Sequence, residues 1–367
     1  SRTEETTSRA LSMRYKKGKV RKTMDKKELT SLIKQIADCR GVSGSEEPVA
    51  QLCHDIMSRY TCNAEIKNGN VLAHFGSRSP EKPHVLIDAH LDRVGLIATY
   101  ITEEGFVKAD CLGGLDRRIF PAQRVIIHGG EDICGVICTL PPHLKKDSSV
   151  MDKDQIYIDT MLSPARARKL IHPGDGISFD SPCHELIPDS GRICGAALDD
   201  RCGIACIIAA VDALGGKYDE LPFTFTVMFS TQEELGERGA CIGAFEVDPD
   251  ISIAVDVSFA MSMGENPRKC GEMAKGCMIG YAPSLDRRLS KWFTEYAENN
   301  NIPFQYEVMN GTTGTNADRF SVNRCGSRAV TLSIPLRYMH TPAEVIDAED
   351  VILTAKLITA FLKEGAI

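Results

Sequence analysis

The stretch TQEELGERG at residues 231–239 places two glutamates side by side. Glu233 and Glu234 directly follow LPFTFTVMFS, an apolar and β-branched run that predicts a buried strand. Neighbouring side chains on the turn after a strand point in different directions. One glutamate can therefore bind a metal ion while the other faces a water molecule as a base. The alternative interpretation is a solvated turn, which is the usual setting of an exposed glutamate pair.

Acidic and histidine side chains also mark four other places that follow predicted strands. These are His90 with Asp92, Asp199 with Asp200, Asp256, and His340. In an open α/β sheet the carboxyl ends of the strands form the ligand crevice, so all five clusters can converge on one site. Imidazoles combined with carboxylates suit Zn²⁺, Co²⁺ or Mn²⁺. Two such ions about 3.5 Å apart need one carboxylate that bridges them and another that takes a proton from the shared water.

The spacing of these residues in the sequence does not by itself decide whether they bind metal ions. The chain has no HExxH motif, and ligands dispersed over about 250 residues match no local template. The segment ALDD before an apolar helix is also a favourable helix start. The metal site is favoured because LIDAHLD and AVDVS place acids inside otherwise apolar strands. Burying an acid in this way is costly without a cation or another partner.

The elements that must position these residues alternate between helical and strand patterns. They predict an α/β fold with a central mixed sheet flanked by helices. Apolar residues begin to share one helical face from Lys27, and Asp347 is a candidate N-cap of the last helix. Residues 96–188 instead read as short strands separated by turns, which predicts a small β-barrel-like domain inserted between residues 27–95 and 189–367. Residues 1–26 are basic and predict a disordered tail.

Composition excludes several classes of protein. The chain has 367 residues and a formal net charge of −7, which argues against a nucleic-acid partner. No apolar run has the length of a membrane span and the N-terminus lacks a signal-peptide core, so we expect no membrane association and a cytoplasmic location. The fourteen cysteines are scattered and form no CxxC pair, so we expect reduced thiols rather than disulfides or a thiolate zinc site.

A set of motifs in a fixed order gives the sequence a specific resemblance. From about Lys27 to the C-terminus, the chain resembles the TET-type, FrvX-like dinuclear-metal aminopeptidases of metallopeptidase family forty-two, some of which carry the names glutamyl aminopeptidase or endoglucanase. The motifs that carry the resemblance are GVSGSEEPVA, NGNVLAHF, DAHLDRVG, PAQRVIIHG, PPHL, QIYIDT, HPGDGISFDS, GAALDDR, QEELGERGA, AVDVS and IPLRYMHTPAEVI.

The resemblance implies a role for each candidate residue. His90 and Asp256 are similar to the ligands of one metal, and Glu234 and His340 to the ligands of the other. Asp199 is similar to the carboxylate that bridges the two.

Two further catalytic roles and one backbone feature follow from the same resemblance. Glu233 is similar to the general base, and Asp92 to the carboxylate that fixes the tautomer of the imidazole two residues earlier. The family also carries a cis peptide bond after its bridging aspartate, which here falls between Asp199 and Asp200.

The activity implied is the metal-dependent removal of N-terminal residues from short peptides. A water bridging two divalent ions, Zn²⁺ or else Co²⁺ or Mn²⁺, is activated, and Glu233 takes its proton and passes it to the leaving amine. One metal anchors the free α-amine of the substrate. The resemblance also implies a homo-oligomer, in which the inserted domain forms dimers that assemble into a tetrahedral dodecamer.

The chain departs from the family pattern at two places that we expect near the substrate pocket. Arg93 stands where an acid is common, and Asn316 in TTGTNADRF stands in place of Asp. One hypothesis is that Arg93, Arg319 or Arg337 pairs with an acidic substrate side chain and selects N-terminal Glu or Asp. The alternative is that these arginines form structural ion pairs.

Three other functions remain as alternatives. A deacylase or carboxypeptidase-like hydrolase with the same metals would hold its substrate by a carboxylate and would need an arginine cluster in its pocket. A glycosidase needs two carboxylates across a sugar cleft and no metal, so the histidines beside the acids argue against it. An inactive scaffold would be indicated by a missing ligand, yet all five ligand positions and the base are filled.

Overall fold

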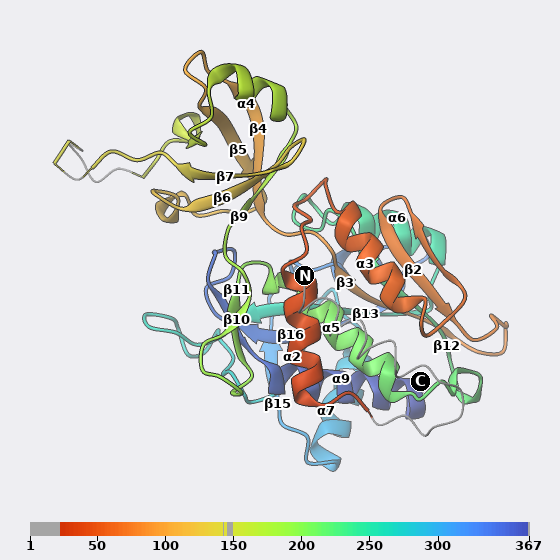
Figure 1. Cartoon of the computed structure of the whole chain (residues 1–367). Helices are drawn as coiled ribbons and strands as arrows, with labels where there is room; N and C mark the ends of the chain where they lie inside the picture. The colour runs from red at the N-terminus through yellow and green to blue at the C-terminus, as the bar shows by residue number, and fades with distance from the viewer. Residues whose placement is uncertain (1–22, 142, 145–149, 366–367) are drawn as a thin grey trace.

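The computed structural model describes residues 23–141, 143–144 and 150–365 (Figure 1). It consists of a large α/β body and a small barrel that stands beside it. Most of the predicted N-terminal tail, residues 1–22, lies outside the described residues. No helix in the described part is long and apolar enough to cross a membrane. All fourteen cysteines are free in this structure.

The large body is built on an eight-stranded mixed sheet, as the sequence predicted. Its strand order is β1-β2-β12-β3-β13-β16-β14-β15. The four central strands β12, β3, β13 and β16 are parallel, whereas β2 and β14 join them in antiparallel pairs. The strands span Ala64–Lys67 (β1), Asn70–Phe75 (β2), Thr224–Ser230 (β12), His84–His90 (β3), Ile251–Phe259 (β13), Arg328–Leu336 (β16), Cys277–Tyr281 (β14) and Phe304–Val308 (β15).

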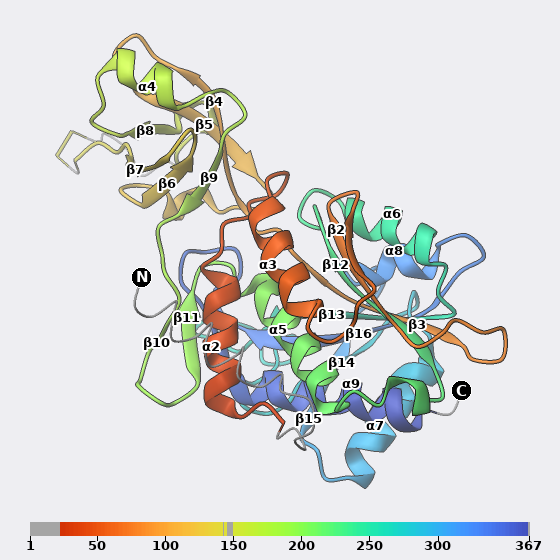
Figure 2. The same cartoon turned by 45° about the vertical axis from the view of Figure 1, so that its right-hand side comes forward.

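Helices cover both faces of this sheet (Figure 2). The larger hydrophobic core lies under α2, α3, α5, α7 and α9, and a smaller one under α6 and α8. Asp347 caps α9 by accepting a hydrogen bond from the backbone N–H of Glu349, as expected. The helices span Lys26–Ala37 (α2), Glu47–Met57 (α3), Leu198–Ala213 (α5), Arg238–Val247 (α6), Arg287–Asn299 (α7), Ala317–Ser321 (α8) and Ala348–Glu364 (α9).

The inserted domain is a closed six-stranded barrel in the order β4-β5-β8-β7-β6-β9. It has its own hydrophobic core, in which Phe120, Ile127 and Ile177 are fully buried. A short helix, α4 (Pro164–Leu170), covers one end and was not anticipated from the sequence. The barrel strands span Gly95–Ile101 (β4), Val107–Leu112 (β5), Tyr157–Asp159 (β8), Asp132–Ile137 (β7), Arg124–His128 (β6) and Gly176–Phe179 (β9).

The chain enters and leaves the barrel beside the candidate site. It passes from β3 through His90 and Asp92 directly into β4. It returns through a three-stranded sheet of β10 (His184–Glu185), β11 (Arg192–Gly195) and β17 (Glu344–Asp347), and reaches Asp199 shortly after β11. The two crossings therefore bring residues about a hundred positions apart to the same edge of the large sheet.

Candidate metal centre

The parallel register of the central strands brings the candidate ligands to one edge of the sheet. Ser230 at the end of β12 pairs with His90 at the end of β3, so the Glu233–Glu234 turn begins beside His90. Asp256 lies near the end of β13, on the other side of β3. Since the carboxyl ends of parallel strands meet at the same edge, these side chains share one crevice.

Asp199 lies between the two histidines and presents one carboxylate oxygen to each. Its Oδ1 is 3.0 Å from His90 Nε2, and its Oδ2 is 3.3 Å from His340 Nε2. Asp256 Oδ1 is 4.0 Å from the same His90 nitrogen, and Glu234 Oε1 is 3.1 Å from His340 Nε2. The five predicted ligands thus form two groups that share Asp199.

Backbone carbonyls fix the tautomer of both imidazoles. His90 Nδ1 lies 3.0 Å from the carbonyl oxygen of Asp92, and His340 Nδ1 lies 2.8 Å from that of Gly114. A carbonyl oxygen can only accept a hydrogen bond, so in each ring Nδ1 carries the proton and donates. Each neutral ring then leaves the Nε2 lone pair directed at the carboxylates, which is the arrangement of a metal-binding histidine.

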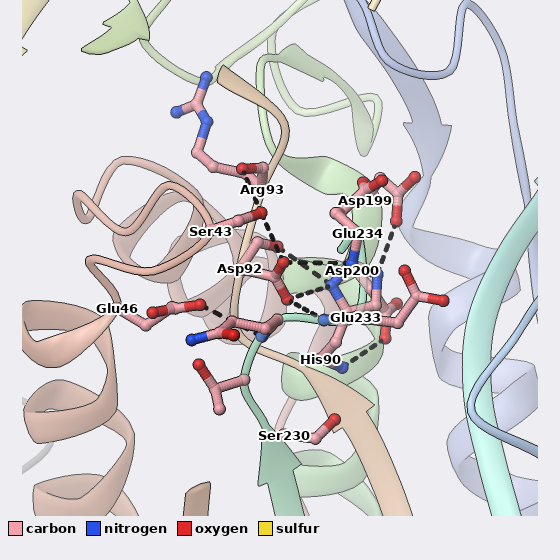
Figure 3. Close-up of polar contacts among 12 residues, drawn as sticks. Ser43, Glu46, His90, Asp92, Arg93, Asp199, Asp200, Ser230, Glu233 and Glu234 are labelled. Carbon is pink, nitrogen blue, oxygen red and sulfur yellow. Dashed lines mark hydrogen bonds and ion pairs between the residues drawn. The ribbon is translucent and has the colours of Figure 1, made fainter. Parts of the chain in front are cut away.

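The Asp92 carboxylate has a different set of partners from those expected (Figure 3). Its nearest oxygen is 3.5 Å from His90 Nδ1, farther than the Asp92 backbone carbonyl. It accepts hydrogen bonds from the backbone N–H of Glu233 at 2.8 Å and of Glu234 at 3.2 Å, and from the Ser43 hydroxyl at 2.7 Å. Despite its burial, these donors and His90 hold the pKa of Asp92 below its ordinary value. Asp92 therefore anchors the backbone of the glutamate pair.

The centre contains more acid than its own bases can neutralise. Burial, together with the surrounding carboxylates, raises the pKa of Asp256 well above its usual range and that of Glu233 to about 8. Burial alone would lower the pKa of His90, yet the carboxylates of Asp199 and Asp92 raise it well above its ordinary value. These directions show that the crevice favours added positive charge. The donor set of imidazole nitrogens and carboxylate oxygens fits divalent ions such as Zn²⁺, Co²⁺ or Mn²⁺.

Asp200 belongs to the cluster but was not among the predicted ligands. Carboxylate oxygens of Asp200 and Asp256 and a ring nitrogen of His90 lie within 4.8 Å of one another, as do ligand atoms of His90, Asp199 and Glu234. Both Asp200 oxygens already accept backbone hydrogen bonds, from His90 at 3.2 Å and Gly203 at 3.1 Å. Asp200 therefore ties the start of α5 to the end of β3. The peptide bond between Asp199 and Asp200 is cis, which confirms the prediction from the resemblance.

A cavity of about 790 Å³ opens over the centre. Its floor includes the metal-ligand candidates and Glu233, while Met278, Glu307 and residues 312–315 extend the lining toward β14 and β15. Arg268 and Lys269 also line it and are exposed. The cavity therefore contains the acidic cluster together with a region lined by apolar, polar and charged side chains.

None of the three arginines proposed to select acidic substrates lines this cavity, so that hypothesis is wrong for these residues. Arg93 is buried and is directed away from the cluster (Figure 3). Arg319 pairs with Glu237 at 3.0 Å, and Arg337 donates to the carbonyl oxygen of Met261 at 2.6 Å. Of the three, Arg319 forms the structural ion pair that the alternative interpretation stated.

Asn316 does not itself line the cavity, although its neighbour Thr315 does. Asn316 is buried and donates from Nδ2 to Asp88 Oδ2 at 2.6 Å and to the Ser230 hydroxyl at 2.9 Å. Oδ2 of Asp88, the buried acid in LIDAHLD that suggested a cation, thus accepts hydrogen bonds from Asn316 and Ser230. Burial raises the pKa of Asp88 to about 7.

Comparisons with known proteins agree with this fold. A model of the M42 glutamyl aminopeptidase family matches residues 69–357. A lysyl aminopeptidase of Pyrococcus furiosus is 33% identical over 341 residues, which cover 91% of this chain and 96% of the relative. An aminopeptidase structure from Desulfurococcus kamchatkensis superposes with a TM-score of 0.85 at 29% identity, covering 93% and 96% of the two chains. The TET1 peptidase of Pyrococcus horikoshii, which can assemble into a tetrahedron or a large octahedral shell, gives a TM-score of 0.79 at 28% identity, covering 92% and 99%.

Proposed function

The chain belongs to the M42 glutamyl aminopeptidase family, and it is a metallo-aminopeptidase that hydrolyses peptide bonds. We propose that it removes N-terminal residues from short peptides at a centre for two divalent cations, with Glu233 as the general base. The observation that carries this proposal is the position of Asp199, whose two oxygens face the Nε2 atoms of His90 and His340. A carboxylate placed between two imidazoles in this way suits a bridging ligand.

The proposed ligand sets follow from the two groups. His90, Asp199 and Asp256 would hold one cation, and Asp199, Glu234 and His340 the other. When bound, the two cations would lower the pKa of a water molecule and polarise the scissile carbonyl. Cations bound by these residues would also neutralise the buried acids and so allow many carboxylates to lie together.

Glu233 is the proposed base because it belongs to the cluster without a place in either ligand set. The backbone N–H of Glu233 donates a hydrogen bond to Asp92 Oδ1 at 2.8 Å. This contact holds the turn so that Glu233 and Glu234 line the cavity. In the proposed reaction the Glu233 carboxylate accepts a proton from the attacking water and then delivers it to the leaving amine. The acidic crevice also attracts the protonated α-amine of a peptide, which favours cleavage at the N-terminal residue.

A deacylase or carboxypeptidase of the same fold would need cationic side chains that bind the carboxylate of its substrate. The only cationic side chains of the described residues that line the cavity, apart from the histidines, are the exposed Arg268 and Lys269. The acids around the metal ligands instead favour a substrate with a free amine. The aminopeptidase is therefore the better fit.

The test uses protein that is stripped with a chelator and then given Zn²⁺, Co²⁺ or Mn²⁺. We expect restored hydrolysis of aminoacyl-p-nitroanilides and none of their N-acetyl derivatives. Glu233→Gln should abolish the activity while metal binding persists, and Glu237→Gln on the same turn, outside the cavity lining, serves as the matched control. Equal cleavage of blocked substrates would contradict the proposal.

We also propose that the chain forms a homo-oligomer built from dimers, with the tetrahedral dodecamer as the assembly. The assembly of the Pyrococcus horikoshii relative supports this, as do large apolar side chains exposed on the barrel or in its loops. Examples are Tyr100, Val136, Leu140 and Met161. Analytical ultracentrifugation should give a mass twelve times that of the 40.2 kDa chain, and a purely monomeric species would refute the assembly.

A further inference from the structure

Glu307 is an acidic side chain in the cavity that the proposed chemistry does not use. It lies on β15 and lines the same cavity as His90, Asp199 and Glu233. Its Oε2 accepts a hydrogen bond from the Ser333 hydroxyl at 2.7 Å. Within the described part of the chain, no Lys, Arg or His nitrogen lies within 4.0 Å of its carboxylate. Glu307 is therefore held in place by hydrogen bonds but lacks a cationic partner.

The sheet register places Glu307 on the same face as the metal centre. Asp256 on β13 pairs with Ser333 on β16, and paired residues project from the same face. The Ser333 hydroxyl in turn reaches Glu307. Glu307 lies opposite Gly280 of β14, which has no side chain to block its path toward Ser333. The Glu307 carboxylate therefore reaches across β14 to the strand that neighbours Asp256.

The walls between the centre and Glu307 suit a long side chain with a charged end. Met278 and Met309 line the cavity and can contact the methylene stem of a Lys or Arg. A substrate bound with its α-amine at the acidic centre can therefore extend its first side chain toward β15. A charged group at the far end would meet the Glu307 carboxylate.

The two basic side chains of the cavity do not offset the attraction of Glu307 for a cation. Arg268 and Lys269 are exposed at the rim, where solvent and salt screen them. Burial raises the pKa of Glu307, with the Ser258 and Ser333 hydroxyls offsetting part of the effect. An incoming cation favours the ionised carboxylate, so binding and ionisation support each other.

We propose that Glu307 determines the substrate specificity of the centre and selects peptides that begin with Lys or Arg. This inference rests on the proposed aminopeptidase function and names the substrate class of the same site. Its basis is one carboxylate of this chain, and the name of the Pyrococcus furiosus relative, lysyl aminopeptidase, agrees with this substrate class.

The first experiment compares Lys-, Arg-, Leu- and Glu-p-nitroanilide with the metal-reconstituted protein. We expect kcat/KM for Lys and Arg to exceed that for Leu by at least about tenfold, with Glu lowest. Glu307→Gln should lower kcat/KM for Lys by roughly 30-fold or more, as expected when one partner of a buried charge pair is removed, and change the value for Leu by less than about threefold. Glu272→Gln, an exposed acid outside the cavity lining, is the matched control and should change neither.

A second measurement reads binding without turnover. L-Lysine should raise the Tm of the metal-loaded protein more than L-leucine or L-glutamate does, and Glu307→Gln should remove this difference. Cleavage of Leu or Glu substrates faster than Lys, or an unchanged Lys preference in Glu307→Gln, would overturn the inference and leave the aminopeptidase proposal intact. Failure to cleave any free-amine substrate would overturn the proposed function, and an equal Tm shift by all three amino acids would then overturn the specificity inference as well.

Discussion

The Asp92 carboxylate accepts a hydrogen bond from the backbone N–H of Glu233 at 2.8 Å. The neighbouring oxygen accepts from Glu234 at 3.2 Å, so one buried carboxylate positions both the proposed base and a proposed metal ligand. The Asp92 backbone carbonyl meanwhile orients His90. Asp92 thus connects two strand ends through its backbone and side chain together.

Asp92→Asn should impair catalysis more than folding. The amide supplies only one oxygen and places an N–H₂ donor against a backbone N–H. We expect kcat/KM to fall by about 10- to 100-fold, the usual effect of removing a residue that supports metal ligands. Ser43→Ala removes a hydroxyl donor from the same carboxylate and is the milder control. Steady-state kinetics at saturating metal will show whether the two variants differ, and equal activity would argue against the positioning role.

Asp199→Asn should prevent the centre from holding two cations. The substitution keeps the side-chain size but replaces one of the two oxygens that face His90 and His340. We expect the metal content to fall below two ions per chain and activity to be lost, because the bridging carboxylate is missing. Elemental analysis after dialysis measures the stoichiometry. Retention of two tightly bound ions would exclude Asp199 as the bridge.

Asn316→Leu should destabilise the protein through Asp88. The leucine matches the asparagine in size but removes the amide donor 2.6 Å from Asp88 Oδ2. Leaving a buried acceptor short of a donor costs about 1–3 kcal/mol of unfolding free energy. Urea titration at neutral pH measures the loss, with Asn300→Leu on an exposed helix end as the control. An unchanged free energy of unfolding would show that Ser230 alone satisfies Asp88 Oδ2.

We expect the protein to lose stability in mild acid because of the environment of His84. Its ring nitrogens each lie 2.8 Å from a threonine hydroxyl, of Thr224 and Thr226. Burial, followed by the charges of Arg78 and His74, lowers the pKa of His84 from 6.5 to about 4, while Asp250 acts in the opposite direction. The unfolded chain therefore takes up a proton at higher pH than the folded one.

The lowered pKa of His84 determines the direction in which the free energy of unfolding changes with pH. The contribution of His84 is fully present above pH 6.5 and is lost as the pH falls toward about 4, by about 3 kcal/mol in total. His84→Gln does not titrate and should flatten the curve of unfolding free energy against pH in this window. His172→Gln, at an exposed histidine, is the matched control. Parallel curves for the wild type and His84→Gln would contradict the assignment.

Much of the fold could be predicted from local patterns. The apolar stripe of α2, made by Leu29, Leu32, Ile33 and Ile36, is buried as its spacing predicted. The change to short strands after residue 95 indicated the barrel. These features are local because helix and strand periodicity depend on neighbours within a few positions. The helix Pro164–Leu170 escaped prediction because it is only seven residues long and has a single buried residue.

The sequence by itself determined which side chains were available for chemistry and that they follow predicted strands. Only the tertiary structure decided which of them meet. It placed Asp199 between two histidines, assigned the Asp200 carboxylate to backbone donors, moved Arg93 away from the cavity and brought Glu307 into it. The physical reason is that strand order and barrel insertion set these distances, and both join residues too far apart in sequence for any local pattern to relate them.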